Sequence, residues 1–595
     1  MVFGIGKLAG GNPGGNLPTV DPQDQQEQDA FSTQEKGTDV SPSRASQSSD
    51  EINPDAPDGV KKSEITASNW TVPTLLMAYV CVFIIMFVNS LQMQISFNVL
   101  PYVTSSFSLH SLTATTGVVS SIVGGVSRLP LARLLDVVGR GEGFVLMVFL
   151  TTIAIIMMAT CNNVETYAAA QVFYWIGMNG MDFVLDVFIA DTSSLKNRAI
   201  MYAFTTSPFI ATTFAGPAAA GNFIDGAGWR WAYGTFAIVT PAMTLPFIAL
   251  YWWKVRQARS EEKLVKQPSG RTFPQSVKYY LIEFDVLGLL LICAGFSMFL
   301  LPFSLASYQA DQWRSPMIIC LLVFGLVSLV LFAIWEKFFA PRSFMPFWML
   351  KNRTVLGACL SAGTNFISFY CWNALFRSYL QVVHNVTIAE AGYIANIFNL
   401  GSCAFAFVVA ALVRGTHRFK WIALTFTPLQ ILGTGLMIYF RQPNQAIGYV
   451  IMCQIFIAFA RGALVICEQI AVMAAVPHEN VAVALALHSM FASVGNAIGA
   501  SLSGGIWTNI LPERLERYLP EELQPEASTI YGDLTVQLSY PMGSPARDAI
   551  LQAYGDVQRL MTIAATCFLI LTLLCVIIWR NINLKEVKEV KGLAF

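Results

Sequence analysis

The sequence predicts an all-α membrane protein. From Val72 to Ile578, apolar runs follow one another almost without a break, each ended by a short charged or Gly/Pro-containing segment. A helix of about 20 apolar residues crosses the hydrocarbon core of a bilayer, and each run is long enough to do so. The composition agrees, because 54% of the residues are hydrophobic and only 12% are charged, whereas soluble proteins have about 25% charged residues.

The apolar runs divide into about fourteen predicted membrane-spanning helices, with boundaries uncertain by about 2–4 residues. The predicted spans are residues 72–99, 112–130, 143–161, 167–189, 199–221, 232–253, 285–306, 317–336, 354–376, 389–412, 421–440, 446–474, 481–508 and 560–579.

Both chain ends are predicted to lie in the cytoplasm. Lys and Arg are concentrated in the loops on the same side as the N-terminus, as expected for cytoplasmic loops. Residues 1–69 are rich in Gly, Pro, Asp, Gln and Ser and predict a disordered tail, and residues 580–595 form a short basic tail. The formal net charge is zero, so no basic surface indicates nucleic-acid binding.

Cysteines and histidines are scattered along the chain. The 11 cysteines include no CxxC pair and lie almost entirely within apolar runs, and the 5 histidines show no metal-ligand spacing. Such cysteines are typical packing residues. A protein-built metal site is therefore not expected, and the absence of a phosphate-binding loop motif argues against ATP as the energy source.

Charged residues inside the predicted spans are the first functional signal. Asp182 and Asp186 lie one helical turn apart in the fourth span, Arg461 and Glu468 share a face of the twelfth, and His488 lies in the thirteenth. Charged residues inside a membrane helix mainly line a substrate or ion pathway or pair with another charged residue. A carboxyl group removed from water holds its proton more tightly and can exchange it near neutral pH. We therefore predict proton coupling by Asp182, Asp186, Glu468 and His488, with a static ion pair as the alternative.

The loop between the second and third spans resembles a superfamily signature. Residues 131–143 read LARLLDVVGRGEG, which is similar to the loop motif of the major facilitator superfamily. Asp136, Gly139 and Arg140 match that motif. Asp136 can cap a helix N-terminus while Arg140 bridges to a neighbouring helix, so the three residues are predicted to form a conformational latch.

Two further segments keep an exporter open as an alternative. Residues 215–221 read AGPAAAG and resemble the glycine–proline motif of proton-coupled antiporters, and residues 228–231 read GWRW, as in fourteen-span drug exporters. The small residues at 215–221 also allow close helix approach, and a packing role would explain both segments equally well. A proton antiporter that exports drugs or glutathione is therefore the alternative function.

Longer stretches favour import. The chain resembles the fungal siderophore–iron transporter family, a branch of the major facilitators, from about residue 70 onward. The stretches that carry the resemblance are ADTSSLKNRA at 190–199, LFRSYLQVVHNVTIAEAGY at 375–393, PHENVAVALALHSMFASVGNAIGASLSGGIWTNILPERLERYLP at 477–520 and SYPMGSPARDAILQAYGDVQR at 539–559.

The resemblance implies a transporter, not an enzyme, that imports a ferric siderophore with protons and needs no cofactor. Its membrane would be the plasma membrane, or else an endosomal or vacuolar one. The implied fold places six-helix bundles at residues 70–253 and 354–579, with a basic loop and an inserted helix pair at 254–353. Alternating access would come from rocking of the two bundles. A signalling role through the N-terminal tail is a third, unsupported hypothesis.

The first, fourth, ninth and twelfth spans line the central cavity in the superfamily fold. A ferric siderophore brings its own iron ligands, so the cavity needs hydrogen-bonding and aromatic groups. Gln94 and Asn98 belong to the polar stripe of the first span. Tyr554, in an external loop predicted at 509–559, would meet the chelate first, and Arg461 would meet an acid of the fourth span or the substrate. The predicted substrate-binding residues are Asn89, Gln92, Asn365, Tyr370, Trp372, Arg461 and Tyr554.

Overall fold

The computed structural model describes residues 70–108, 116–127, 130–131, 134, 139–192, 207–260, 273–283, 285–309, 311–340, 347–476 and 481–584. Residues Asp55–Phe595 form one compact unit. The described residues are almost entirely helical and contain no strand, which agrees with the all-α prediction.

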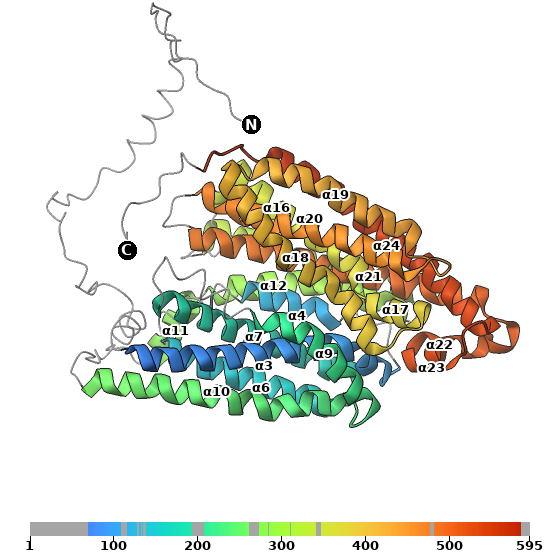
Figure 1. The fold of residues 1–595 in the computed structure, drawn as a ribbon, viewed down its shortest axis with the longest axis horizontal. Coiled ribbons are helices and arrows are strands. Elements are labelled where there is room, and N and C mark those ends of the chain that lie inside the picture. Colours follow the sequence, from blue (N-terminus) through green and yellow to red (C-terminus); the bar gives the residue numbers. More distant parts are fainter. Residues whose placement is uncertain are drawn as a thin grey trace, which may run out of the picture. The chain divides into compact units, whose positions relative to one another are not determined.

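The N-terminal bundle packs the helices of the first predicted half against one another (Figure 1). α3 contacts α9 and α10, and α6 contacts α7 and α10. The helices of this bundle are α3 (Val72–Ser105), α4 (Thr116–Val126), α6 (Arg140–Thr160), α7 (Val164–Thr192), α9 (Pro208–Asp225) and α10 (Trp229–Ser260).

An inserted segment follows, in which α12 packs along α14. α12 also contacts α4, and α13 contacts α21 of the C-terminal bundle, so the insertion touches both bundles. The helices of the insertion are α11 (Phe273–Glu283), α12 (Val286–Leu300), α13 (Pro302–Leu305), the short turns η2 (Ala306–Tyr308) and η3 (Gln312–Arg314), α14 (Pro316–Ile334), the π-helix η4 (Trp335–Phe339) and α15 (Phe347–Leu350).

The C-terminal bundle is built around α16, which contacts α20, α21 and α24. Its chain runs through α16 (Arg353–Asn373), α17 (Phe376–His384), α18 (Ile388–Thr416), α19 (Lys420–Phe440), α20 (Ile447–Ala474), α21 (Val481–Tyr518), η6 (Glu521–Glu526), α22 (Ala527–Gly532), α23 (Leu534–Ser539) and α24 (Pro545–Ile578). In Figure 1 these helices, coloured yellow to red, lie together.

Within the described residues, 12 helices are long and apolar enough to cross a membrane. They coincide with all the predicted spans except 112–130 and 199–221. Those two overlap α4 and α9, whose preceding residues lie outside the described part. The count of about fourteen spans and the side of the membrane on which the termini lie stay predictions.

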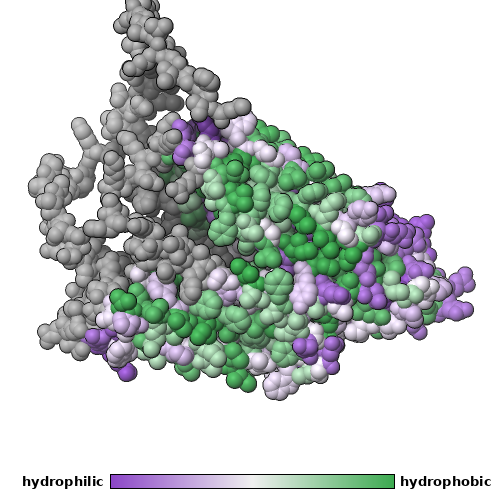
Figure 2. Space-filling model, in the orientation of Figure 1, coloured by the Kyte–Doolittle hydropathy of each residue, from purple (hydrophilic) through white to green (hydrophobic). Residues whose placement is uncertain are grey.

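The segment predicted as an external loop is largely helical. α21 continues to Tyr518 because Leu511, Leu515 and Leu519 recur at helical spacing and are buried. α24 starts at Pro545, with Ser544 as its N-cap. We call the segment between them, residues 519–544, the cap. On the face shown in Figure 2, hydrophobic residues cover the sides of the bundle and hydrophilic residues gather at the end that carries α22 and α23, the cap end.

Candidate functional site

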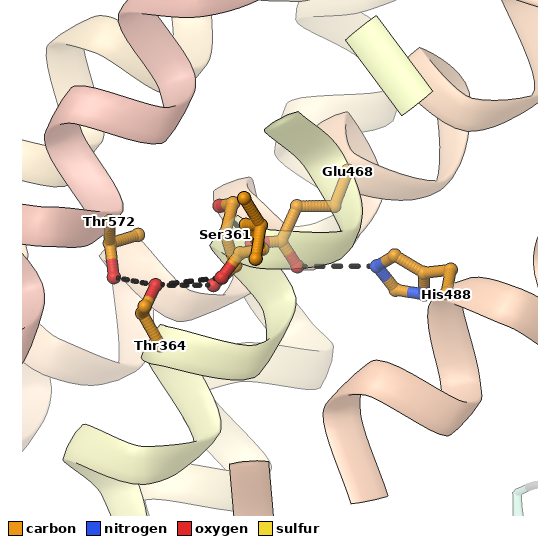
Figure 3. Close-up of polar contacts among 6 residues, drawn as sticks. Ser361, Thr364, Glu468, His488 and Thr572 are labelled. Atoms are coloured by element: carbon orange, nitrogen blue, oxygen red, sulfur yellow. Dashed lines mark hydrogen bonds and ion pairs between the residues drawn. The ribbon is translucent and has the colours of Figure 1, made fainter. Parts of the chain in front are cut away.

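A buried acid–base pair lies inside the C-terminal bundle (Figure 3). Glu468 on α20 is 1% exposed and His488 on α21 is 7% exposed. Their closest atoms, Glu468 Oε2 and His488 Nε2, are 3.6 Å apart. Ser361 Oγ of α16 donates to the other carboxylate oxygen, Glu468 Oε1, at 2.6 Å. Side chains from separate helices thus converge on one carboxyl group.

Glycines allow these helices to approach closely. A Cβ on Gly495 of α21 would lie 2.2 Å from the carbonyl oxygen of Gly363, and one on Gly499 would lie 2.6 Å from that of Ile367, both on α16. Contact this close requires residues without side chains. The same contact holds His488 and Ser361 within reach of Glu468.

The hydroxyl groups near Ser361 do not extend a proton path. Thr364 Oγ1 lies 2.8 Å from Thr572 Oγ1, but it reaches Ser361 through the backbone carbonyl. A carbonyl accepts a hydrogen bond and cannot pass a proton on. Within the described residues, His488 is the ionisable group that contacts Glu468.

Arg461 lies on the same helix as Glu468 but makes a different contact. Its guanidinium stacks over the ring of Phe366 at 4.3 Å. Its Nη1 atom is buried without a hydrogen-bond partner in the described structure. A buried guanidinium with an unused donor is costly unless another state or a ligand satisfies it. Its predicted meeting with an acid of α7 stays a prediction.

The N-terminal bundle holds a second polar contact. Asn89 Nδ2 on α3 donates to Asp182 Oδ1 on α7 at 3.2 Å. Gln92, one turn further along α3, accepts a hydrogen bond from Tyr174 at 3.4 Å. Asp182 is half-buried, whereas Asp186 is exposed. The two aspartates predicted to act together therefore lie in different surroundings.

The predicted substrate residues of α16 belong mainly to a packed interior. Trp372 is 1% exposed and contacts Phe369, Phe376 and Phe398. Asn365 accepts a hydrogen bond from Gln430 at 3.0 Å, and Tyr370 lies edge-on to Phe369. Their role in binding stays a prediction.

Only part of the predicted latch is described. Asp136 lies outside the described residues. Gly139 precedes α6 with φ of 107°, a conformation that favours glycine. Arg140 is the first residue of α6 and lines a cleft between α6, α7 and α10 with Phe144 and Tyr251.

Tyr554 is part of the protein interior. It is fully buried on α24, its hydroxyl donates to Gln537 Oε1 of the cap at 2.5 Å, and its ring lies edge-on to Trp507. In this conformation the ring offers no surface to a ligand, so its predicted recognition role requires a rearrangement of the cap.

Truncation at this position should act on folding. Tyr554→Ala leaves a large cavity, which costs about 3–5 kcal/mol for a buried aromatic side chain. We expect much less folded protein in the membrane, and a small effect for Tyr554→Phe, which loses only the hydroxyl contact. Surface amount and detergent-extract monodispersity measure this. Normal amounts of Tyr554→Ala with a raised KM for substrate would restore the recognition role.

Comparison with known proteins decides the family. The sequence pattern of the Major Facilitator Superfamily matches residues 82–369 and 358–511. MFS siderochrome iron transporter 1 of Ajellomyces capsulatus is 52% identical over 545 residues, 91% of this chain and 93% of the relative. Siderophore iron transporter mirB of Emericella nidulans is 42% identical over 90% of this chain and 89% of the relative. The chain belongs to the fungal siderophore–iron transporters of the Major Facilitator Superfamily.

Solved structures agree on the fold of this transporter. A bacterial homologue of the human lysosomal transporter Spinster, inward-facing and occupied, has a TM-score of 0.54 at 16% identity and covers 85% of this chain and 97% of its own. A peptide transporter of the POT family in complex with sulfate gives 0.51 at 12% identity, with 82% and 96% covered. The predicted major facilitator fold is confirmed, as is the assignment to a family of transporters, not enzymes.

Sequence reasoning missed buried arginines that hold this transporter together. Arg441 donates to the carbonyl of Trp372 at 2.7 Å and stacks over Phe376 and Tyr379. Arg547 donates to the carbonyl of Val382 at 2.8 Å. Both are fully buried. Their hydrogen-bond acceptors are backbone carbonyls, which leave no residue pattern, and their positions at helix ends resemble those of ordinary loop arginines.

The segment 228–231 also has a structural role. Arg230 Nη1 donates to the carbonyls of Cys161 at 2.7 Å and Ala159 at 3.2 Å, at the C-terminal end of α6. A cation there satisfies carbonyls that have no partner inside the helix. The motif that favoured an exporter therefore joins α10 to α6, whichever direction the cargo takes.

Proposed function

We propose that this transporter imports a ferric siderophore across the plasma membrane together with protons. The observation that supports a ferric siderophore as cargo is the 52% identity of this chain, over 91% of its length, to MFS siderochrome iron transporter 1. The relatives from Emericella nidulans and Schizosaccharomyces pombe also bear siderophore iron transport in their names. In this orientation the cap end faces the outside and both termini face the cytoplasm.

Glu468 and His488 are our candidates for the proton-carrying pair. The carboxyl group is 1% exposed, and its direct ionisable neighbour within the described residues is His488. A carboxyl group and an imidazole can both bind and release protons. The two groups lie on different helices, α20 and α21, so a relative movement of these helices would change their contact, which is what coupling requires. Asp182, bonded to Asn89, is the second candidate, with Asp186 beside it.

Arg461 is our candidate for the substrate-binding cation. Its buried, unused Nη1 donor lies two helical turns from Glu468 on the same helix. A chelate presents carbonyl or carboxylate oxygens around its iron, and these accept hydrogen bonds from a guanidinium. Binding there would place cargo and proton site on one helix. Asn89, Gln92, Asn365 and Tyr370 remain further candidates for contacts to the cargo.

Uptake of iron-loaded siderophores tests the cargo and the direction together. The chain is expressed in a yeast lacking its own siderophore carriers, and uptake of several radio-iron siderophores is measured with and without a protonophore. We expect saturable accumulation of at least one chelate that the protonophore abolishes. Cells carrying the empty vector give the background.

Faster loss of a preloaded drug or of glutathione, with no accumulation of chelated iron, would instead establish the proton-driven exporter. The AGPAAAG segment alone does not favour that function. In the structure a Cβ on Gly216 would lie 2.4 Å from Gln94 Cβ, and one on Gly392 of α18 would lie 2.5 Å from Pro217 Cβ, so the segment serves close packing between helices.

A further inference from the structure

The C-terminal bundle contains buried polar side chains that do not contact the Glu468–His488 pair. α16 and α19 each contact both α20 and α24, so these four helices surround one interior. The polar side chains belong to α16, α19 and α24 and are 0–3% exposed: Asn365, Ser368, Gln430, Thr434 and Gln558. We call these five residues the buried polar set.

A hydrogen bond joins the α16 and α19 parts of the set. Gln430 Nε2 donates to Asn365 Oδ1 at 3.0 Å. Ser368 and Thr434 follow Asn365 and Gln430 by one helical turn, so each shares a face with its predecessor. The polar faces of α16 and α19 therefore meet inside the bundle.

The α24 part lies beside the cap-side end of α19. Gln442, just after α19, donates to the carbonyl of Gly555 at 3.2 Å, three residues before Gln558. The two helices pack loosely further in, where a Cβ on Gly435 would have Thr566 Cγ2 as its nearest neighbour at 3.9 Å. Gln558 therefore joins the same interior, at a place where the helices leave room.

Most polar atoms of this set have no hydrogen-bond partner among the described residues. These atoms are Asn365 Nδ2, Ser368 Oγ, Gln430 Oε1, Thr434 Oγ1, Gln558 Nε2 and Gln558 Oε1. A buried polar atom without a partner is costly, above all inside a membrane. The set offers donors and acceptors together but no carboxylate or imidazole, which suits water better than a metal ion or an anion.

One end of the set reaches the acid–base pair through Ser361. Ser361 precedes Asn365 by one turn of α16 and donates to Glu468 Oε1 at 2.6 Å. A hydroxyl donates one hydrogen bond and accepts others, so Ser361 Oγ can also accept one from a water beside Asn365.

Arg441 lies at the other end, seven residues beyond Thr434. Its Nε and Nη2 atoms are buried and have no partner among the described residues. A fixed cation repels an incoming proton. The cap-side end of the set therefore gives protons no entry, and the set is not a proton path from the outside.

We propose that the buried polar set binds internal waters, and that these waters support Glu468 through Ser361 when His488 moves away. Glu468 and His488 lie on different helices, so a movement that separates them leaves Ser361 as the partner of the carboxyl group. Water behind Ser361 keeps that hydroxyl oriented toward the carboxyl group. Water binding stands without the proposed function, whereas the link to Glu468 rests on the proton coupling proposed above.

Radiolysis of bound water tests the first part. An X-ray pulse turns water into hydroxyl radicals, which oxidise a methionine beside a buried water even where bulk solvent cannot reach it. Met437 and Met561 are 0% exposed and lie three residues after Thr434 and Gln558. In the detergent-extracted protein we expect both to oxidise about fivefold faster than Met349, which is 1% exposed within an apolar cluster.

A double variant tests the second part. Thr434→Val with Gln558→Leu keeps most of the volume and removes the polar atoms, so oxidation of both methionines should fall to the rate of Met349. Net proton-driven uptake should fall about tenfold, the effect of losing one hydrogen bond near a charged group. Counterflow should be unchanged, because exchange does not require the transporter to return with Glu468 deprotonated.

Thr427→Val is the matched control, because it makes the same change on the same helix. The Thr427 hydroxyl is fully buried and already donates to the carbonyl of Ala423 at 2.7 Å, so it leaves no donor for water. This variant should oxidise and transport like the unchanged protein. The same loss of uptake in Thr427→Val would overturn the link to Glu468.

The remaining outcomes separate the two parts. Oxidation of Met437 and Met561 as slow as that of Met349 in the unchanged protein would overturn the proposal, and this result needs no variant. A higher melting temperature of the double variant would also overturn it, because apolar groups stabilise an interior that is dry. Fast oxidation in the unchanged protein, with normal net uptake in the double variant, would establish the water and refute only its link to Glu468. Uptake that ignores a protonophore would refute the coupling and leave the water in place.

Discussion

Glu468→Gln is expected to abolish proton-driven accumulation of the chelate while leaving exchange of chelate across the membrane. Glutamine keeps the shape and can still accept the hydrogen bond from Ser361, but it cannot take up a proton. Each symported proton allows about tenfold accumulation per unit of pH gradient. The variant should therefore lose this tenfold accumulation, and its cargo should only reach equal concentrations on the two sides of the membrane. Uptake measured against external pH, with counterflow as the exchange assay, shows the difference.

The control is Glu165→Gln, at an exposed position on α7, which should transport normally. Asp182→Asn tests the competing assignment, in which Asp182 carries the coupled proton. If Asp182→Asn removes the response to pH while Glu468→Gln retains it, coupling belongs to the N-terminal bundle and the Glu468–His488 pair is structural. Loss in both variants would mean that the two sites act together.

Arg547→Met is expected to have the largest effect on folding. Its guanidinium is fully buried and donates to the carbonyls of Gln537 and Val382. Methionine fills much of the space but donates nothing, and each buried carbonyl left without a donor costs about 1–3 kcal/mol. The cap should detach from α17, and little folded protein should reach the membrane. Thermal stability of the detergent-extracted protein measures the loss.

Arg559→Met is the matched control, because Arg559 lies on the same helix and is exposed. It should retain the stability of the unchanged protein within about 0.5 kcal/mol, as surface substitutions usually do. Equal stability of the two variants would show that the carbonyls near Arg547 find other donors, and that the cap does not depend on this residue.

Hydropathy located the membrane helices well because burial in lipid leaves a long apolar signal. It failed where a helix leaves the apolar region. α21 and α24 extend into the predicted loop on amphipathic turns, where charged residues such as Glu516 hide the buried leucine face. The break between α16 and α17 was also missed, because the sequence through 374–375 contains neither glycine nor proline.

The candidate site was predictable in part for a similar reason. Intramembrane charges are rare, so Asp182, Arg461, Glu468 and His488 could be singled out from sequence. Their partners could not, because helix order alone does not tell which faces meet. Ser361 and Asn396 are ordinary polar residues until packing places them beside a carboxyl group or an open carbonyl. Tyr554 was assigned to a ligand because hydropathy placed it in an external loop, whereas α24 begins at Pro545 and buries it.

The carbonyl of Thr213 has a consequence for the hydration of the transporter. Pro217 leaves it without a partner in α9, and Asn396 satisfies it only while α9 and α18 are together. When they part, a buried carbonyl in a membrane protein must find a new donor, and water is the donor at hand. Separation of α9 from α18 during alternating access should therefore bring water to the depth of Thr213.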